Sequence, residues 1–241
     1  MIHFNKDDLE EEFLVCFLHI PKTGGQTLWG ILRAQPTNII VKHGTYFEKF
    51  NKPCAYVTML RDPVDRVIST YYYIRNTVRD PLCEQVNNMS LEEFIQYMER
   101  EDVENNPYEP MEDLRNIKFR TVNLATRYLS GGDPTQLAAA KENLRNYFLL
   151  AGMTEMYSES LFFMEKLFGW KIAAGTKMRN NNPNRIPVHE VSPSMIERIK
   201  ELNQLDIELY EGAKAKFLRQ IELLSKETKE ELEAWKQKFT W

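Results

Sequence analysis

The segment FLVCFLHIPKTGGQTLWGIL, residues 13–32, decides the fold class. It opens with a run of apolar residues that stops at Pro21, which is typical of a buried parallel strand. Apolar residues then recur at helical spacing from about Gln26 to Arg33, so the segment predicts a strand, a tight turn and a helix in that order. Gly24 and Gly25 permit the unusual torsions and the close approach that such a turn needs.

The turn PKTGG, residues 21–25, carries groups that bind anions. A strand, a glycine-rich turn and a helix in this order aim main-chain N–H groups and the helix N-terminus at one point. Lys22 adds a mobile positive charge, and Thr23 and Thr27 add hydroxyl donors. The lysine precedes the glycines, so the turn departs from the ATP-binding pattern G-x-x-x-x-G-K-[ST]. An ordinary strand-to-helix turn with a surface lysine is the alternative interpretation.

A second basic element is MLRDPVDRVISTYYY, residues 59–73. Asp62 followed by proline predicts the start of a helix directly after a strand. Arg61 ends that strand and Ser69 lies two turns into the helix, an offset of about 12 Å at ~1.5 Å per residue. The long Arg61 side chain and the hydroxyl can therefore converge on one tetrahedral anion. The alternative is that Arg61 and Arg66 pair with neighbouring aspartates.

The rest of the chain predicts further alternation of strands and helices. We expect strands over 38–42, 55–60 and 147–153, helices over 63–78, 91–100, 136–146 and 158–169, and two long helices from Pro193 to about Phe239. This alternation is typical of an α/β fold with a P-loop-like central parallel sheet, helices on both faces and, here, long C-terminal helices. Because no linker or repeat divides the chain, we expect a single domain over residues 1–241.

Composition and charge exclude several classes of protein. The 241 residues are 43% hydrophobic and 27% charged, as in ordinary globular domains. A net charge of −4 without a basic stripe argues against broad binding of nucleic acid. No apolar run reaches the length of a transmembrane segment, and the first residues are acidic, so we expect a cytoplasmic protein. The 3 cysteines lack metal-type spacing, and no metal is expected.

The two basic elements together support a resemblance. PKTGGQTL and RDPVDRVISTYYY, each after a strand, resemble the two nucleotide signatures of sulfotransferases that use 3′-phosphoadenosine 5′-phosphosulfate (PAPS). Residues 140–170 and 203–217 are similar to the carbohydrate branch of sulfotransferase family 2, which includes the heparan sulfate 2-O-sulfotransferases and their bacterial relatives. This resemblance implies a bacterial member of that branch. The resemblance covers residues 13–217 and leaves 218–241 as a C-terminal helical extension.

The resemblance implies roles for individual residues. The 5′-phosphosulfate would be held by Lys22, Thr23, Gly24, Gly25, Gln26 and Thr27. Lys22 would also be catalytic, because it would stabilise the leaving phosphate oxygen. Arg61 and Ser69 would hold the 3′-phosphate. PAPS would be the co-substrate, adenosine 3′,5′-bisphosphate (PAP) the product, and no metal would be required. In this family a late loop closes over the nucleotide, and here that loop would add contacts from Arg179, Asn181 and Asn184.

His43 is the candidate general base. Sulfuryl transfer to an alcohol requires removal of the hydroxyl proton, and histidine is suited to this near neutral pH. Among the 4 histidines, His43 follows a predicted strand and opens KHGTYF, the segment in which the family carries an HG-containing motif. Thr45 stands where the 2-O-sulfotransferase pattern has a second histidine. His19, inside the first strand, is interpreted as a core residue.

The leading hypothesis is a sulfotransferase that moves a sulfuryl group from PAPS to an acceptor hydroxyl by in-line transfer. The acceptor is expected to be a carbohydrate or a small metabolite. One alternative is a small-molecule kinase that uses ATP and Mg²⁺. Another is a non-catalytic nucleotide-binding scaffold whose C-terminal helices mediate dimerisation. The identity of the acceptor and the oligomeric state, including a homodimer, stay open.

Overall fold

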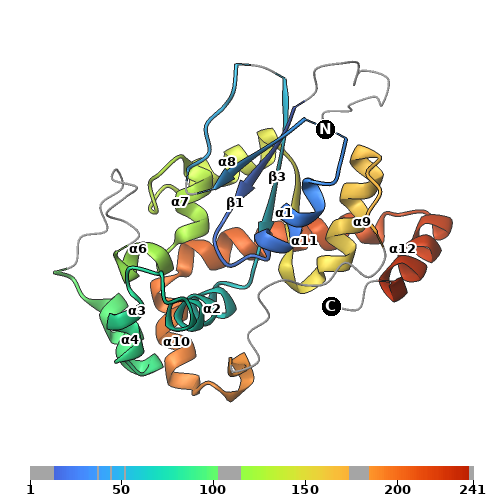
Figure 1. Ribbon diagram of the computed structural model, residues 1–241. Coiled ribbons are helices and arrows are strands. Elements are labelled where there is room, and N and C mark those ends of the chain that lie inside the picture. Colours follow the sequence, from blue (N-terminus) through green and yellow to red (C-terminus); the bar gives the residue numbers. More distant parts are fainter. Residues whose placement is uncertain are drawn as a thin grey trace.

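A parallel β-sheet forms the centre of the computed structural model, which describes residues 14–36, 38–43, 45–51, 53–102, 115–173 and 185–238. Within these residues the sheet has four strands in the order β2-β1-β3-β4 (Figure 1). The strands are β1 (Leu14–His19), β2 (Asn38–His43), β3 (Cys54–Leu60) and β4 (Phe148–Met153). The α/β fold with a central parallel sheet is therefore confirmed.

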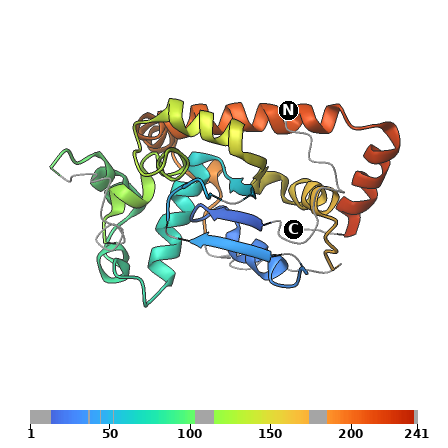
Figure 2. The ribbon, with the colours of Figure 1, turned by 90° about the horizontal axis from the view of Figure 1, so that it is seen from above.

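Helices follow the strands and cover both faces of the sheet. In chain order they are α1 (Gly25–Leu32), α2 (Pro63–Asn76), α3 (Cys83–Asn87), α4 (Leu91–Glu99), α6 (Ile117–Thr121), α7 (Leu124–Ser130), α8 (Leu137–Tyr147), α9 (Tyr157–Phe168), α10 (Pro193–Leu202), α11 (Gln204–Glu222) and α12 (Lys226–Lys238). Two short 3₁₀ turns, Thr154–Met156 and Val188–Glu190, join them. In Figure 2 the long orange helix α11 and the yellow-green α8 run along one side of the sheet, and the blue α1 lies on the other.

Two apolar clusters stabilise the molecule. The larger cluster contains the strands and the apolar faces of α1, α7, α8, α9, α11 and α12. Burial on both faces explains why β1 is an almost continuous apolar run. The second cluster lies among α2, α3, α4, α6 and α10, which gather at the lower left of Figure 1. Helix α2 directly follows β3, so this second cluster is attached at the carboxyl ends of the strands.

The carboxyl ends of the strands meet at one edge because all strand pairs are parallel. His19 ends β1 and pairs in register with His43 at the end of β2, and Leu60 ends β3 beside Met153 at the end of β4. In open α/β sheets this edge is where ligands bind. The edge therefore positions the PKTGG turn, which follows β1, and Arg61, which follows β3.

The C-terminal region corrects one expectation. The described residues contain three helices after Ser192, α10, α11 and α12, where the sequence predicts two. The break between the first two has a physical cause at Asn203. Its buried side chain donates to the carbonyl of Ile199 and accepts the main-chain N–H of Asn123, so it bonds the local backbone instead of continuing the helix. Ser192 caps α10 through the N–H of Met195, as expected.

The other predicted strands and helices agree with the structure to within two residues at each end. Helices α3, α6 and α7 are not among the predicted elements; they have five, five and seven residues, too few for a hydrophobic period to show. None of the helices described is both long and apolar enough to cross a membrane.

Candidate functional site

The PKTGG turn leaves main-chain donors available at the N-terminus of α1. Gly24 caps this helix with φ 79°, and no side chain occupies the cap. In the described parts of the chain, nothing accepts a hydrogen bond from the main-chain N–H of Thr23, Gly24 or Gly25. No acidic residue lies in the first turn of α1. Free N–H groups at a helix N-terminus attract anions, so the turn can hold a phosphate-like group.

Lys22 adds its charge to this turn from an unusual backbone conformation. Its φ is 69°, in the left-handed region, and Gly24 two residues later is also left-handed. Turns that mix right- and left-handed residues make concave nests of N–H groups that bind anions. The Lys22 ammonium lies 3.9 Å from the centre of the Tyr73 ring, a cation–π contact. Tyr73 on α2 thus holds the lysine side chain beside the turn.

Arg61 connects the turn to α2. Its Nη1 donates to the carbonyl oxygen of Lys22 at 2.9 Å, and its Nε donates to Oδ2 of Asp65 at 2.6 Å. Asp65 also forms an ion pair with Arg185, whose Nη2 donates to the Asp65 carbonyl at 3.3 Å. One carboxylate therefore faces two guanidinium groups, and Glu155 and Asp62 add further negative charge near Arg61. The sequence-based alternative that Arg61 pairs with a neighbouring aspartate is correct for Asp65, and the pairing leaves Arg61 at the turn.

One face of α2 collects these cations. Asp65, Ser69 and Tyr73 are spaced by four residues and so share a helix face. Asp65 holds Arg61 at one end of this face, and Tyr73 holds Lys22 at the other. Ser69 lies between them, half-buried, and its hydroxyl has no hydrogen-bond partner among the described residues. The structure thus brings the Arg61 and Ser69 elements together with Lys22.

Burial and neighbouring positive charges lower the pKa values of Lys22 and Arg185. Burial, with the nearby charges of Arg61, Arg120 and Arg185, lowers the pKa of Lys22 to about 8. Burial and Arg61 lower the pKa of Arg185 to about 10. Each of these shifts is reversed by a bound anion, because an opposite charge favours the protonated form. The cluster Lys22, Arg61 and Arg185 therefore favours the binding of an anion.

The hydroxyl groups of Thr23 and Thr27 form hydrogen bonds with other groups of the protein. Thr23 is buried and donates to the carbonyl of Ile20 at 2.8 Å, which closes the turn. Thr27 is buried in α1, and its side chain is in hydrogen-bond contact with the Tyr157 phenol. The exposed Gln26 lies between them in the first turn of α1. The geometry assigns the turn's contacts with an anion to main-chain N–H groups.

His19 and His43 are backbone partners at the ends of β1 and β2. His43 ends β2 at the carboxyl edge, next to the PKTGG turn that follows β1. His19 is 9% exposed, stacks on Phe17 at 5.5 Å between ring centres, and occupies the space that a side chain on Gly25 would need. The interpretation of His19 as a core residue is confirmed. The backbone of His43 lies at the same edge as the turn, and its role as a general base stays a prediction.

Three further predicted contacts lie outside the described residues: Arg179, Asn181 and Asn184. Arg185, the next residue after them, is described and reaches the site, although the sequence does not single it out. Thr154 and Tyr157, which hold carbonyls of the turn, were missed as well. The only signal for them in the sequence is their place just after a predicted strand, at the same edge as the turn.

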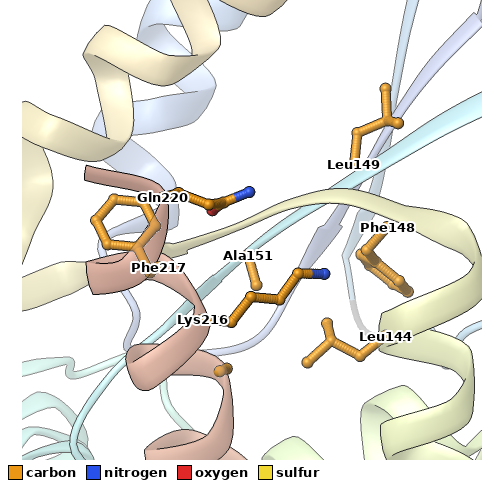
Figure 3. A pocket seen from close by; sticks show the side chains of 8 residues that line it. Leu144, Phe148, Leu149, Ala151, Lys216, Phe217 and Gln220 are labelled. Atoms are coloured by element: carbon orange, nitrogen blue, oxygen red, sulfur yellow. The ribbon is translucent and has the colours of Figure 1, made fainter. Parts of the chain in front are cut away.

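A small apolar pocket lies elsewhere in the molecule, between α8, β4 and α11 (Figure 3). Leu144, Phe148 and Leu149 line it towards the amino end of β4, and Lys216 and Gln220 of α11 border it. The PKTGG turn lies at the carboxyl edge of the sheet. None of the residues that line this pocket belongs to the candidate site.

Comparison with known proteins shows similarity to sulfotransferases. The family model described as galactose-3-O-sulfotransferase matches residues 14–238. The chain is 29% identical to heparan-sulfate 6-O-sulfotransferase 3-B of Danio rerio over 73% of its length, and 27% identical to galactosylceramide sulfotransferase of Mus musculus over 71%. These alignments cover 45% and 40% of the relatives, so the chain spans less than half the length of the curated relatives it matches.

Proposed function

Because the chain belongs to the galactose-3-O-sulfotransferase family, we propose that it moves a sulfuryl group from PAPS to a hydroxyl group of a carbohydrate. One observation carries the proposal: Arg61 of the second basic element donates to the main chain of the PKTGG turn, which joins two anion-binding elements into one site. A donor with phosphate groups at both its 3′ and 5′ positions matches such a double site. PAP would be the product.

The chemistry follows from the positions of the groups. The N–H groups of the turn and Lys22 face the 5′ end, where negative charge grows on the leaving phosphate oxygen during transfer. Arg61 and Ser69, with Arg185 beside them, hold the 3′-phosphate and so orient the donor. His43 at the end of β2 takes the proton from the acceptor hydroxyl. In-line transfer needs these three functions and no metal.

The proposal names the donor, PAPS, but only the chemical class of the acceptor. The relatives are named for heparan sulfate and galactosylceramide, and a carbohydrate hydroxyl is common to both names. The closer likeness to 2-O-sulfotransferases and a bacterial origin stay predictions, as does the cytoplasmic location. Radiolabelled PAPS with desulfated heparan sulfate and galactosylceramide as acceptors tests the proposal. Transfer to neither of them, or to any glycan in a wider panel, would contradict a carbohydrate acceptor.

The kinase and scaffold alternatives make different predictions for the same protein. A kinase binds ATP more tightly than PAP and needs Mg²⁺ to do so. A scaffold binds PAP but transfers no sulfuryl group to any alcohol. Calorimetry with PAP and with ATP, each with and without Mg²⁺, separates the kinase from the sulfotransferase. Tighter, metal-dependent binding of ATP would overturn our proposal.

Loss of either cation should weaken nucleotide binding. We expect Lys22→Ala and Arg61→Ala each to reduce the affinity for PAP by about 1.5–3 kcal/mol, because each removes a charged donor to a phosphate. Arg198→Ala is the matched control, since it removes a guanidinium whose Nε bonds Glu99 at 2.6 Å on the exposed side of α10. Calorimetric titration with PAP measures all three variants. An equal loss of PAP affinity in Arg198→Ala would show that the effect is not specific to Lys22 and Arg61.

The affinity for PAP should fall as pH rises through 8. The pKa of Lys22 is about 8 in the unliganded protein, and a bound phosphate raises it. Above pH 8, binding must therefore take up a proton, and the affinity falls by up to about tenfold per pH unit until the bound-state pKa is passed. Calorimetry from pH 7 to 9.5, in buffers of different ionisation enthalpy, measures both affinity and proton uptake. Lys22→Arg should be independent of pH in this range; the same pH dependence in that variant would exclude Lys22 as the cause.

A further inference from the structure

Three successive carbonyls of the PKTGG turn each contact a side chain from another part of the chain, and that of Gly24 also accepts the main-chain N–H groups of Thr27 and Leu28 in α1. Arg61 donates to the carbonyl of Lys22. Thr154 Oγ1 donates to the carbonyl of Thr23 at 3.1 Å, and the Tyr157 hydroxyl donates to that of Gly24 at 2.9 Å. Two of the three side chains belong to the short segment that joins β4 to α9. This segment, residues 154–157, therefore contacts two carbonyls of the turn.

The same segment also contacts the second basic element. The Thr154 hydroxyl also lies 2.9 Å from the carbonyl of Leu60, the residue before Arg61, so its single proton is shared between the carbonyls of Thr23 and Leu60. Glu155 accepts the main-chain N–H of Asp62 at 2.8 Å and the Tyr210 hydroxyl at 3.1 Å. Residues 154–157 therefore bond both to the turn and to the end of β3. They fix the distance between the backbone of the turn and the backbone at the end of β3.

Tyr157 is shaped to fit the turn. A Cβ on Gly24 would lie 2.7 Å from Cε2 of Tyr157, so the ring occupies the space that only glycine leaves open. Burial raises the pKa of the Tyr157 phenol, which therefore stays protonated and can donate. Left-handed residues such as Lys22 cost about 1–2 kcal/mol relative to right-handed ones. The backbone keeps this conformation only where neighbouring groups hold it.

We propose that Thr154 and Tyr157 are positioning residues: they hold the carbonyls of Thr23 and Gly24, so that the N–H groups of the turn stay aimed at the 5′-phosphate. This inference rests on the proposed function. It assigns the Tyr157 hydroxyl to the 5′ end of the donor alone, whereas the Thr154 hydroxyl, which also contacts the carbonyl of Leu60, serves both ends. Loss of the Tyr157 hydroxyl should therefore weaken the binding of nucleotides with a 5′-phosphate and not of a nucleotide with only a 3′-phosphate.

The test compares three nucleotides that differ only in their phosphates: PAP, adenosine 5′-monophosphate and adenosine 3′-monophosphate. Tyr157→Phe keeps the ring and removes the hydroxyl, and Thr154→Val keeps the shape of the side chain and removes its hydroxyl. We expect Tyr157→Phe to weaken PAP and the 5′-monophosphate by about three- to tenfold, the value of one hydrogen bond, and to leave the 3′-monophosphate unchanged. Thr154→Val, which also removes the contact with Leu60 beside Arg61, should weaken all three nucleotides. Thr154→Ser keeps a hydroxyl at this position and should bind all three nucleotides like the unaltered protein.

Tyr71→Phe is the matched control, because the buried Tyr71 hydroxyl donates to the carbonyl of Met89 at 2.8 Å, within the second apolar cluster. It should bind all three nucleotides like the unaltered protein. Equal losses for the 5′- and 3′-monophosphates in Tyr157→Phe, or no loss at all, would overturn the inference. Failure of the unaltered protein to bind PAP would instead contradict the proposed function, so the two failures are distinguishable.

Discussion

Replacement of His43 by alanine is expected to slow sulfuryl transfer by about 10²–10⁴-fold while PAP binding stays nearly unchanged. His43 ends β2 at the carboxyl edge, one strand away from the end of β1 that leads into the PKTGG turn. A base placed there acts on the acceptor hydroxyl and makes no contribution to holding the nucleotide. The measurement is the initial rate of transfer from labelled PAPS to a glycan acceptor, together with the calorimetric affinity for PAP.

His189→Ala is the control for this experiment. The side chain of His189 is 80% exposed in the short turn before α10, and it lies near Glu190. Its removal should leave both the rate and the affinity unchanged. Undiminished transfer by His43→Ala would remove His43 from the role of base. A loss of PAP affinity in the same variant would show that it shapes the nucleotide site instead.

The second large effect concerns a buried ionic network that attaches α11 to α7 and α2. The Asp206 carboxylate, 1% exposed, accepts the N–H groups of Ala125 and Thr126 at 2.9 and 2.7 Å. Its Oδ2 also lies 3.7 Å from the buried guanidinium of Arg66. Arg66 donates in turn to the carbonyls at the end of α6, including that of Thr121. Arg66 therefore pairs with an aspartate 140 residues away and not, as the sequence suggests, with Asp62 or Asp65.

Asp206→Ala is expected to lower the free energy of unfolding by about 3–5 kcal/mol, because it leaves the Arg66 charge buried without its partner. Urea denaturation followed by circular dichroism measures the loss. Asp206→Asn keeps one acceptor oxygen for the α7 N-terminus and should lose less. The control is Asp102→Ala, which breaks an exposed pair with Arg100 and should leave the free energy of unfolding nearly unchanged. Equal losses for Asp206→Ala and Asp102→Ala would contradict the importance of the network.

The elements at the site were predictable where short-range chemistry decides them. Asp62 accepts the N–H of Asp65 and is followed by proline, so the start of α2 follows from neighbouring residues alone. The capping box that Ser90 forms with Glu93 fixes the start of α4 in the same way. The break between α10 and α11 at Asn203 was not predictable in this way. The side chain of Asn203 accepts the N–H of Asn123, the residue before α7, and the pattern of apolar residues within one helix does not reveal such a distant partner.

The sequence by itself determined the strand, turn and helix of the anion site, because apolar periods, caps and glycines act over a few neighbouring residues. It also determined that Arg61 and Ser69 share one strand-to-helix junction. Only the tertiary structure decided which groups hold that site in shape. Thr154 and Tyr157 meet carbonyls 131 and 133 residues earlier in the chain, and Arg185 meets Asp65 across 120 residues. Such contacts depend on how the sheet and helices pack together, and side-chain packing has no local signature in the order of residues.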